Sequence, residues 1–341
     1  MALMHQARGA RRGQQPPPPA NDQGPAAPSG HVAVLLREAV EGLAPRRGGR
    51  YLDGTFGGGG HTRALLEASA PDGRVLALDA DPAAIARGAV LREQYGDRLT
   101  LREGNFAALA TRAREAGFAP LDGVLLDLGL SSDQLADPAR GFSFLADGPL
   151  DMRFGPGAAT TAAEIVNTAD ESELVDLLFR YGEERHARRI ARAIVAARRA
   201  APIATTGALA ALVARAAPAR GEQIHPATRT FQALRIAVNG ELDALEEALR
   251  GAVEALAPGG RLAVIAFHSL EDRIVKEFMR REATDCICPP RLPVCVCGHR
   301  ASLRLVARKG IRPGAAEVAA NPRSRSATLR VAEKIAGAEP S

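Results

Sequence analysis

Tryptophan is absent from the 341-residue sequence, and aromatic residues make up only 4% of it. A platform that stacks several unpaired bases on aromatic rings is therefore not expected. The four cysteines all lie between Cys286 and Cys297, so disulfides cannot cross-link the rest of the chain, as is usual in a reducing cytosol. No apolar run approaches the roughly 18 residues of a membrane-spanning helix, and Met1–Ala20 lacks the apolar core of a secretory signal. These absences predict a cytoplasmic protein without membrane spans.

The chain has enough apolar residues to fold and carries its charge unevenly. Hydrophobic residues make up 46% of it, and its length allows about two domains. The net charge is only +5, yet the segment from Arg180 to Arg235 holds eleven arginines against three acidic residues. A second basic segment, from Gly298 to Ser341, holds nine basic residues against three acidic ones. This asymmetry favours a polyanionic partner, although an ordinary solvated surface is the alternative.

Residues 1–30 differ in composition from everything that follows. The proline run Pro16–Pro19 and the separate prolines Pro25 and Pro28 interrupt a stretch without hydrophobic periodicity. We expect this segment to be a disordered tail.

Short apolar segments alternate with helical patterns after residue 31. The expected strands are 50–53, 74–78, 99–101 and 123–126, and helices are expected over 61–68 and 82–91. Strands that are apolar on both faces and alternate with helices indicate a parallel sheet in an α/β fold.

The next buried strand is expected only at residues 261–267, after a helix over 242–256 and a turn at 257–260. A crossover needs a dozen or more residues, whereas about 130 separate this strand from Asp127. The surplus has helical patterns over 162–166, 171–181, 184–199 and 206–215. We therefore expect an inserted helical domain at 138–236, with 31–137 and 237–341 forming the sheet domain.

Polar residues follow all four early strands. Asp53 precedes the glycine loop 54–60, Asp79 ends the second strand, Asn105-Phe106 follows the third, and Asp127 ends the fourth. Each one alone is a common turn residue. Because parallel strands end at the same edge of a sheet, the four together predict a ligand crevice.

The glycine loop does not fit the G-x-G-x-x-G dinucleotide fingerprint, since Thr62 or Arg63 occupies the position of its last glycine. Asp53 beside the loop suits a cationic cofactor better than a pyrophosphate. Asp79 follows Gly60 by 19 residues and can accept hydrogen bonds from both ribose hydroxyls. A cationic nucleoside without phosphates is S-adenosylmethionine. Phe106 could then cover the adenine, and Gln134 or Asp127 could reach the adenine edge or the methionine end.

Longer motifs then give a family resemblance. They include Tyr51–His61 (YLDGTFGGGGH), Asp127–Ser132 (DLGLSS), Arg140–Phe144 (RGFSF), Gly148–Arg153 (GPLDMR), Tyr181–Arg185 (YGEER), His225–Ile236 (HPATRTFQALRI), Phe267–Arg273 (FHSLEDR) and Asn321–Ser326 (NPRSRS). With these motifs the chain closely resembles the ribosomal RNA small subunit methyltransferase H family, the N4-cytidine methyltransferases of 16S rRNA. The resemblance spans about His31 to Ile335.

The resemblance implies a class I (Rossmann-like) methyltransferase sheet with an inserted all-helical domain. It implies an S-adenosylmethionine site whose residues are Gly59, Gly60, His61, Asp79, Phe106, Asp127 and Gln134. The implied methyl acceptor is the N4 amine of a cytidine in the decoding region of 16S rRNA, so the partner is 16S rRNA, either as naked RNA or within the small ribosomal subunit. The Asp/Asn-Pro-Pro-Tyr loop of DNA amino methyltransferases is missing, and Asp127-Leu128-Gly129-Leu130 stands in its place. The acceptor-activating group therefore does not carry over from those enzymes.

Asp127 is the candidate catalytic residue by position alone. A carboxylate that accepts a hydrogen bond from the cytosine amine would localise its lone pair and take up its proton. A purely cofactor-orienting role is the alternative.

Several side chains could contact RNA. Phe142, Phe144 or Phe231 could hold one flipped cytosine. The arginines of the helix at 184–199 could contact phosphates, or they could simply form a solvated face; they are Arg185, Arg188, Arg189, Arg192, Arg198 and Arg199. His225 and His268 lie in polar turn motifs and receive no catalytic role.

The cysteines form two C-x-C pairs, Cys286/Cys288 and Cys295/Cys297. Four thiolates can bind zinc, but zinc ribbons usually use C-x-x-C, so reduced structural thiols without a metal are preferred.

Two other classes of protein remain open. A small-molecule methyltransferase has no use for two arginine-rich regions, and a non-catalytic RNA-binding protein does not need polar strand ends.

Overall fold

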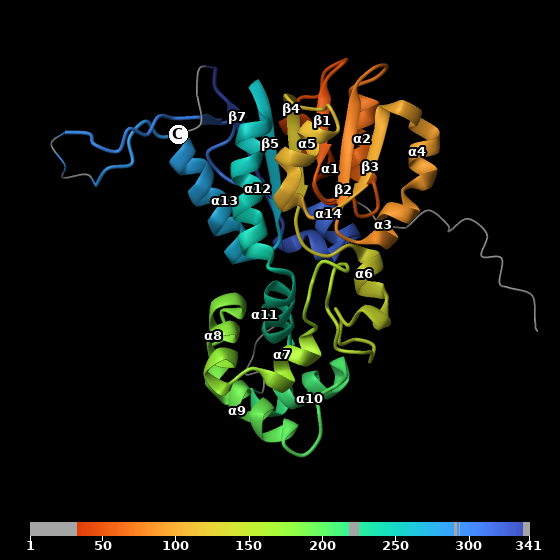
Figure 1. Ribbon diagram of the computed structural model, residues 1–341, viewed down its shortest axis with the longest axis vertical. Coiled ribbons are helices and arrows are strands. Elements are labelled where there is room, and N and C mark those ends of the chain that lie inside the picture. The colour runs from red at the N-terminus through yellow and green to blue at the C-terminus, as the bar shows by residue number, and fades with distance from the viewer. Residues whose placement is uncertain (1–32, 218–224, 290–291, 293, 337–341) are drawn as a thin grey trace, which may run out of the picture.

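A single seven-stranded sheet organises the chain (Figure 1). The computed structural model describes residues 33–217, 225–289, 292 and 294–336, so the predicted tail lies outside the described residues. The strand order is β3-β2-β1-β4-β5-β7-β6. The strands are β1 (Arg50–Asp53), β2 (Arg74–Asp79), β3 (Leu99–Glu103), β4 (Leu121–Asp127), β5 (Leu256–Ala266), β6 (Leu303–Leu305) and β7 (Thr328–Lys334).

The first five strands are parallel, and β7 runs antiparallel between β5 and β6. The predicted α/β class with a parallel sheet is therefore confirmed. One sequence expectation was incomplete, because the predicted turn at 257–260 lies within β5, where the pairing with β4 shifts register between Leu121 and Gly123. The short strands β6 and β7 were not predicted.

Helices cover both faces of the sheet because neighbouring strand residues point to opposite sides. Leu52 and Leu76 pack in one buried cluster with helices α5, α12 and α13, whereas Tyr51 and Val75 pack in another with α1 to α4. The first set of helices is α5 (Leu109–Glu115), α12 (Glu241–Ala255) and α13 (Ser269–Glu282). The second set is α1 (Leu36–Leu43), α2 (Gly60–Ala68), α3 (Pro82–Arg87) and α4 (Ala89–Tyr95).

The helix predicted over 82–91 is in fact divided into α3 and α4 at Gly88. A Cβ atom at Gly88 would lie 2.7 Å from Leu101 and 2.8 Å from the Phe56 ring. Glycine therefore lets this chain segment pack directly against the loop that follows β1.

The segment between β4 and α12 is helical and lies below the sheet in Figure 1. It contains α6 (Ser132–Ala136), α7 (Ala162–Thr168), α8 (Glu171–Gly182), α9 (Ala187–Arg198), α10 (Thr206–Ala216) and α11 (Thr228–Asn239). Helices α7 to α11 share a buried cluster of their own, which includes Ile190 and Leu234. The predicted limit at residue 236 falls inside α11, which leads into α12 through Gly240. Helix α14 (Ala315–Ala320) precedes β7. Within the part of the chain that the structure describes, none of the helices combines the length and the apolar character that a membrane span requires.

Candidate active site

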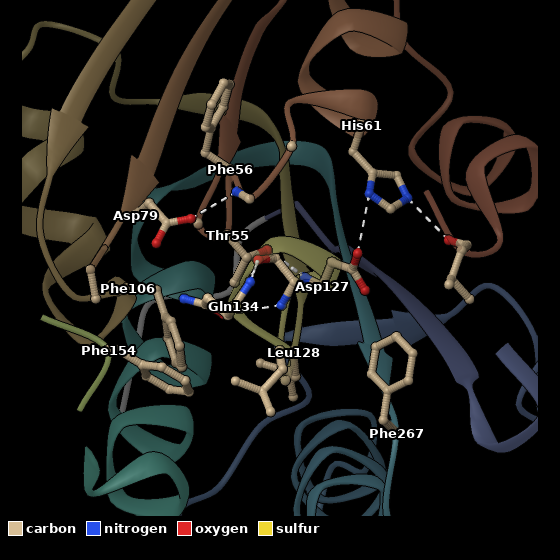
Figure 2. A pocket seen from close by; sticks show the side chains of 18 of the residues that line it. Thr55, Phe56, His61, Asp79, Phe106, Asp127, Leu128, Gln134, Phe154 and Phe267 are labelled. Carbon is tan, nitrogen blue, oxygen red and sulfur yellow. Dashed lines mark hydrogen bonds and ion pairs between the residues drawn. The ribbon is translucent and has the colours of Figure 1, made fainter. Parts of the chain in front are cut away.

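A pocket lies at the carboxyl ends of β1, β2 and β4 (Figure 2). Six of the seven residues expected to hold the cofactor line it: Gly60, His61, Asp79, Phe106, Asp127 and Gln134. The seventh, Gly59, is not among the lining residues. It has a φ of 75°, and a Cβ there would lie 2.8 Å from the Phe56 ring. The backbone at the start of α2 therefore requires glycine at this position for conformational and packing reasons.

Hydrogen bonds to the Asp53 side chain stabilise the conformation of the glycine loop. Its side chain is fully buried and accepts hydrogen bonds from the Thr55 amide (3.1 Å) and the Thr62 hydroxyl (2.7 Å). Burial raises the pKa of Asp53 to about 6. The Thr55 hydroxyl in turn accepts a hydrogen bond from the Asp127 amide at 2.7 Å, which ties the end of β1 to the end of β4.

Asp79 connects the second strand end to the same loop. One carboxylate oxygen accepts from the Gly57 amide at 2.7 Å, and the other accepts from the Asp81 amide at 2.8 Å. Burial raises the pKa of Asp79. Each oxygen has a further lone pair, so the carboxylate can still accept hydrogen bonds from a pair of hydroxyl groups.

Gln134 is held by a helix cap rather than extending freely. Its Oε1 accepts from the Ser131 amide at 3.0 Å, and its Nε2 donates to Asp81 at 3.1 Å. Asp81 also accepts from Arg140 at 2.9 Å. The amide of Gln134 therefore faces the pocket in a fixed orientation, with one Nε2 hydrogen left to donate.

Asp127 and His61 form a buried pair at the other end of the pocket. Asp127 Oδ2 lies 3.4 Å from His61 Nδ1, and His61 Nε2 donates to the Val34 carbonyl at 3.1 Å. A carbonyl can only accept, so Nε2 of His61 carries a hydrogen. Burial, and then the charges of Asp53 and Glu271, raise the pKa of Asp127 well above its ordinary value. The second oxygen, Oδ1, is buried without a hydrogen-bond partner among the described residues.

Aromatic side chains lie at both ends of the pocket. Phe106 and Phe154 lie together near Asp79, whereas Phe267 lies near Asp127 (Figure 2). Phe267 directly follows β5, so its position after a strand end was a usable sequence signal. Phe154 lies in a loop between α6 and α7, and nothing in the sequence marked it.

The three phenylalanines considered for cytosine lie outside this lining. Phe142 is buried and packs against Phe154 with ring centroids 5.5 Å apart. Phe144 packs against Phe231 at 4.9 Å and against His225 at 4.6 Å. The structure therefore places these rings in the packing of the helical segment, and Phe154 connects that packing to the pocket.

Two further carboxylates in the pocket lining were not anticipated. Glu241 forms a two-point ion pair with Arg235, at 2.8 and 2.9 Å. Glu271 accepts from the Phe267 amide at 2.8 Å and lies 3.1 Å from His268 Nε2. His268 thus lies beside Glu271 at the start of α13.

The carboxyl groups give the pocket its electrostatic character. Asp53, Asp79 and Asp127 all have raised pKa values because burial disfavours their charged forms. A cationic ligand relieves this cost, whereas a pyrophosphate adds to it. Arg323, which donates to Ser132 at 3.1 Å, is also in the lining.

The arginines of α9 divide into two groups. Arg198 donates to the carbonyls of Val166 (2.9 Å) and Ala169 (2.7 Å) at the end of α7, so its side chain is used within the protein. The others are exposed: Arg185 and Arg199 flank α9, and Arg188, Arg189 and Arg192 lie on it.

Comparison with known proteins identifies close relatives. The sequence profile described as the MraW methylase family matches residues 28–335. The ribosomal RNA small subunit methyltransferase H of Thermomicrobium roseum is 64% identical over 306 residues, which cover 90% of this chain and 94% of that relative. The protein of the same name from Heliobacterium mobile is 52% identical over 308 residues, which cover 89% of this chain and 99% of that relative.

Proposed function

The chain belongs to the MraW methylase family, and from this membership we propose that it methylates the N4 amine of a cytidine in the decoding region of 16S rRNA. The methyl donor is S-adenosylmethionine. The substrate is the RNA of the small ribosomal subunit, so the enzyme acts in the cytoplasm. The observation that carries the proposal is the pocket at the strand ends, where buried carboxyl groups favour a cationic ligand.

The lining fits the two ends of S-adenosylmethionine. Asp79 can accept the ribose hydroxyls, and Phe106 with Phe154 can cover the adenine. Asp127 and His61, together with Gly60, would then face the methionine end. When bound, the cofactor supplies an activated methyl group on a sulfonium. The protein's contribution is to align donor and acceptor and to handle one proton.

Asp127 is the group that we assign to that proton. The N4 amine of cytosine is a weak nucleophile because its lone pair is delocalised into the ring. Oδ1 of Asp127, which has no partner among the described residues, can accept a hydrogen bond from the amine and then its proton. The raised pKa makes this carboxylate a stronger base than an exposed aspartate. His61 Nδ1 lies 3.4 Å from Oδ2, so the two oxygens of Asp127 have different neighbours.

Contact with the RNA backbone is assigned to the exposed arginines of α9 and its flanks. Arg188 and Arg189 are exposed on a helix whose opposite side, with Ile190 and Ile194, is buried. Arginine side chains on such a face can bind phosphates and so orient the subunit without reading its sequence.

Nucleoside analysis tests the proposed reaction. Small subunits from a strain that lacks the enzyme are incubated with the purified protein and labelled S-adenosylmethionine, and the digested 16S rRNA is analysed. We expect label in N4-methylcytidine at one decoding-region position. Methylation of another base would contradict the acceptor assignment. Cofactor binding without any methyl transfer to RNA would favour a small-molecule methyltransferase, and no cofactor binding would favour a non-catalytic RNA-binding protein.

A further inference from the structure

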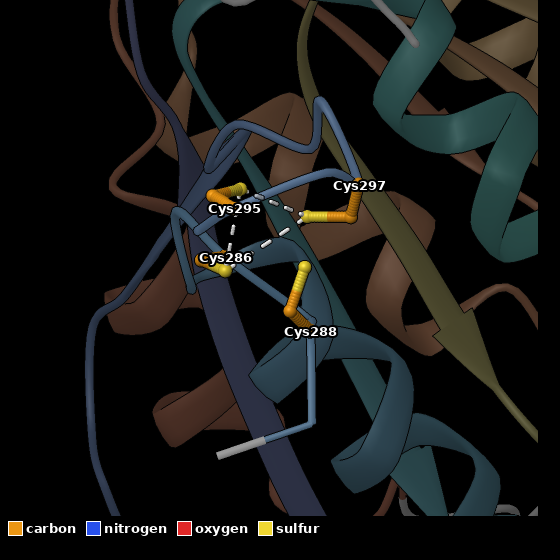
Figure 3. Close-up of side chains that lie close together, drawn as sticks. All are labelled: Cys286, Cys288, Cys295 and Cys297. Atoms are coloured by element: carbon orange, nitrogen blue, oxygen red, sulfur yellow. Dashed lines mark hydrogen bonds between the residues drawn. The ribbon is translucent and has the colours of Figure 1, made fainter. Parts of the chain in front are cut away.

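The sulfur atoms of the four cysteines lie close together, and none of these residues lines the pocket. They lie in the segment between α13 and β6, which projects from the sheet domain beside β7 (Figure 1). Cys286 Sγ lies 3.5 Å from Cys295 Sγ and 3.9 Å from Cys297 Sγ, and Cys295 and Cys297 are 3.6 Å apart. All four sulfur atoms, that of Cys288 included, lie within 4.8 Å of one another (Figure 3).

The three separations among Cys286, Cys295 and Cys297 match the edges of a metal-centred tetrahedron, and Cys288 lies within reach of the same centre. A zinc–thiolate bond is about 2.3 Å long, so two thiolates on one tetrahedral zinc ion lie about 3.8 Å apart. The measured distances lie on both sides of that value. No pair approaches the roughly 2.05 Å of a disulfide bond. We therefore propose that Cys286, Cys288, Cys295 and Cys297 bind one Zn²⁺ ion.

The arrangement of the four sulfur atoms favours a zinc site, whereas the spacing of the cysteines along the sequence favoured thiols without a metal. C-x-C pairs are uncommon in zinc ribbons, and the sequence alone favoured reduced thiols. Spacing along the chain does not show how two pairs are arranged in space, and the fold here brings both pairs to one centre. An iron–sulfur cluster fits less well, because inorganic sulfide between its iron atoms would separate the cysteine sulfurs further.

Among the described residues, the tip of the segment buries no large apolar side chain. Its large apolar side chains face solvent, with 69% of Val294 and 77% of Val296 exposed, so they form no core. Hydrogen bonds anchor the segment at its base, where His299 Nε2 donates to the Arg281 carbonyl and the Ser302 hydroxyl donates to Glu282. A metal ion bound by four thiolates would supply the missing cross-link at the tip.

The ion would be structural. Four protein ligands fill a tetrahedral zinc site and leave no open position for a substrate. Binding converts four thiols and Zn²⁺ into a tetrathiolate complex and releases four protons to solvent. Cys286 and Cys295 are exposed, so the ion can enter from solvent.

Metal analysis of the full-length chain tests the proposal. The protein is purified under reducing conditions without added zinc, and mass spectrometry of the elements is expected to find about one zinc per chain. The double variant Cys286→Ser/Cys295→Ser is expected to contain none. Val296→Ser, which changes the exposed residue between Cys295 and Cys297, is the matched control and is expected to keep its zinc.

Cobalt substitution gives a readout that does not depend on any variant folding. After zinc is removed from the wild-type chain, Co²⁺ is expected to produce thiolate-to-cobalt charge-transfer bands and the intense visible bands of a tetrahedral site. Iron in place of zinc would overturn the identity of the ion. Metal-free protein that also lacks the cobalt spectrum would overturn the site, as would two disulfides found in protein kept under reducing conditions.

Discussion

The two oxygens of the Asp127 side chain have different surroundings. Oδ2 faces His61 at 3.4 Å, whereas Oδ1 is buried without a partner among the described residues. A buried acceptor without a partner costs stability, so its retention beside a ligand pocket suggests that a ligand supplies the partner. Sequence reasoning selected Asp127 because it ends a strand, but only the structure distinguishes its two oxygens.

The first prediction follows from this asymmetry. Asp127→Asn keeps the shape of the side chain but removes its ability to take up a proton. We expect kcat for methylation of small subunits to fall on the order of 10²-fold or more. The dissociation constant for S-adenosylmethionine, measured by calorimetry, should change by less than about tenfold.

Asp133→Asn is a suitable control, because Asp133 lies nearby on α6 and pairs with Arg87 at 3.2 Å but does not line the pocket. It should leave both quantities nearly unchanged. If Asp127→Asn weakens cofactor binding as much as it slows turnover, Asp127 orients the cofactor and takes no part in proton transfer.

Among the helices and strands, the sequence could predict the strands whose residues are apolar on both faces. The residues from Arg50 to Asp53 were predicted as a strand and form β1 with the same bounds. Strand β7 was missed because it carries Arg330 and Glu333, whose charges find partners only in the folded chain. Arg330 pairs with Asp272 on α13, and Glu333 pairs with Arg261 on β5.

The same limit applies to the pocket. Because parallel strands end at one edge, Asp79 and Asp127 could be expected near one another before the structure was known. The fixed amide of Gln134 could not, since it depends on Asp81, which in turn binds Arg140. Phe154 could not either, because a long loop from the helical segment brings it to the pocket.

The second prediction concerns α9. Arg198 and Arg188 look alike in sequence, but Arg198 binds two carbonyls at the end of α7 whereas Arg188 is exposed. We expect Arg198→Met to lower the free energy of unfolding by about 2 kcal/mol, as for hydrogen bonds from a charged donor. Arg188→Met should leave thermal stability unchanged and weaken binding to small subunits, with a shallower dependence on salt.

Thermal unfolding and subunit binding at several salt concentrations separate the two roles. If both variants lose subunit affinity with unchanged stability, the carbonyl contacts of Arg198 contribute little to the fold. If Arg188→Met binds subunits like the wild type, this part of α9 is an ordinary solvated face.

At the scale of the whole molecule, charges of opposite sign serve different regions. The chain is net positive, at +5, with exposed arginines on and around α9. Its pocket instead gathers carboxyl groups, including Asp79, Asp127, Glu241 and Glu271. A basic exterior attracts a polyanion, and an acidic interior attracts a cation. The two surfaces together therefore suit an enzyme that brings a cationic methyl donor to RNA.

The third prediction concerns the pH dependence of the affinity for S-adenosylmethionine, which reports the ionisation of the buried carboxyl groups. The pKa of Asp53 is raised to about 6, so this group is partly protonated near pH 5 and ionises as the pH rises. Burial raises the pKa values of Asp79 and Asp127 as well. A bound cation favours the ionised forms, so affinity for S-adenosylmethionine should increase from pH 5 to pH 7, by roughly fivefold or more.

S-adenosylhomocysteine isolates the cause of this effect, because it lacks only the methyl group and with it the positive charge on sulfur. Its affinity, measured by calorimetry at the same pH values, should change by less than about twofold. Asp53→Asn removes one titrating carboxyl group from behind the glycine loop and should reduce the pH dependence for S-adenosylmethionine alone. Equal pH dependence for both ligands would show that the pocket recognises the nucleoside and amino-acid groups and gains nothing from the sulfonium charge.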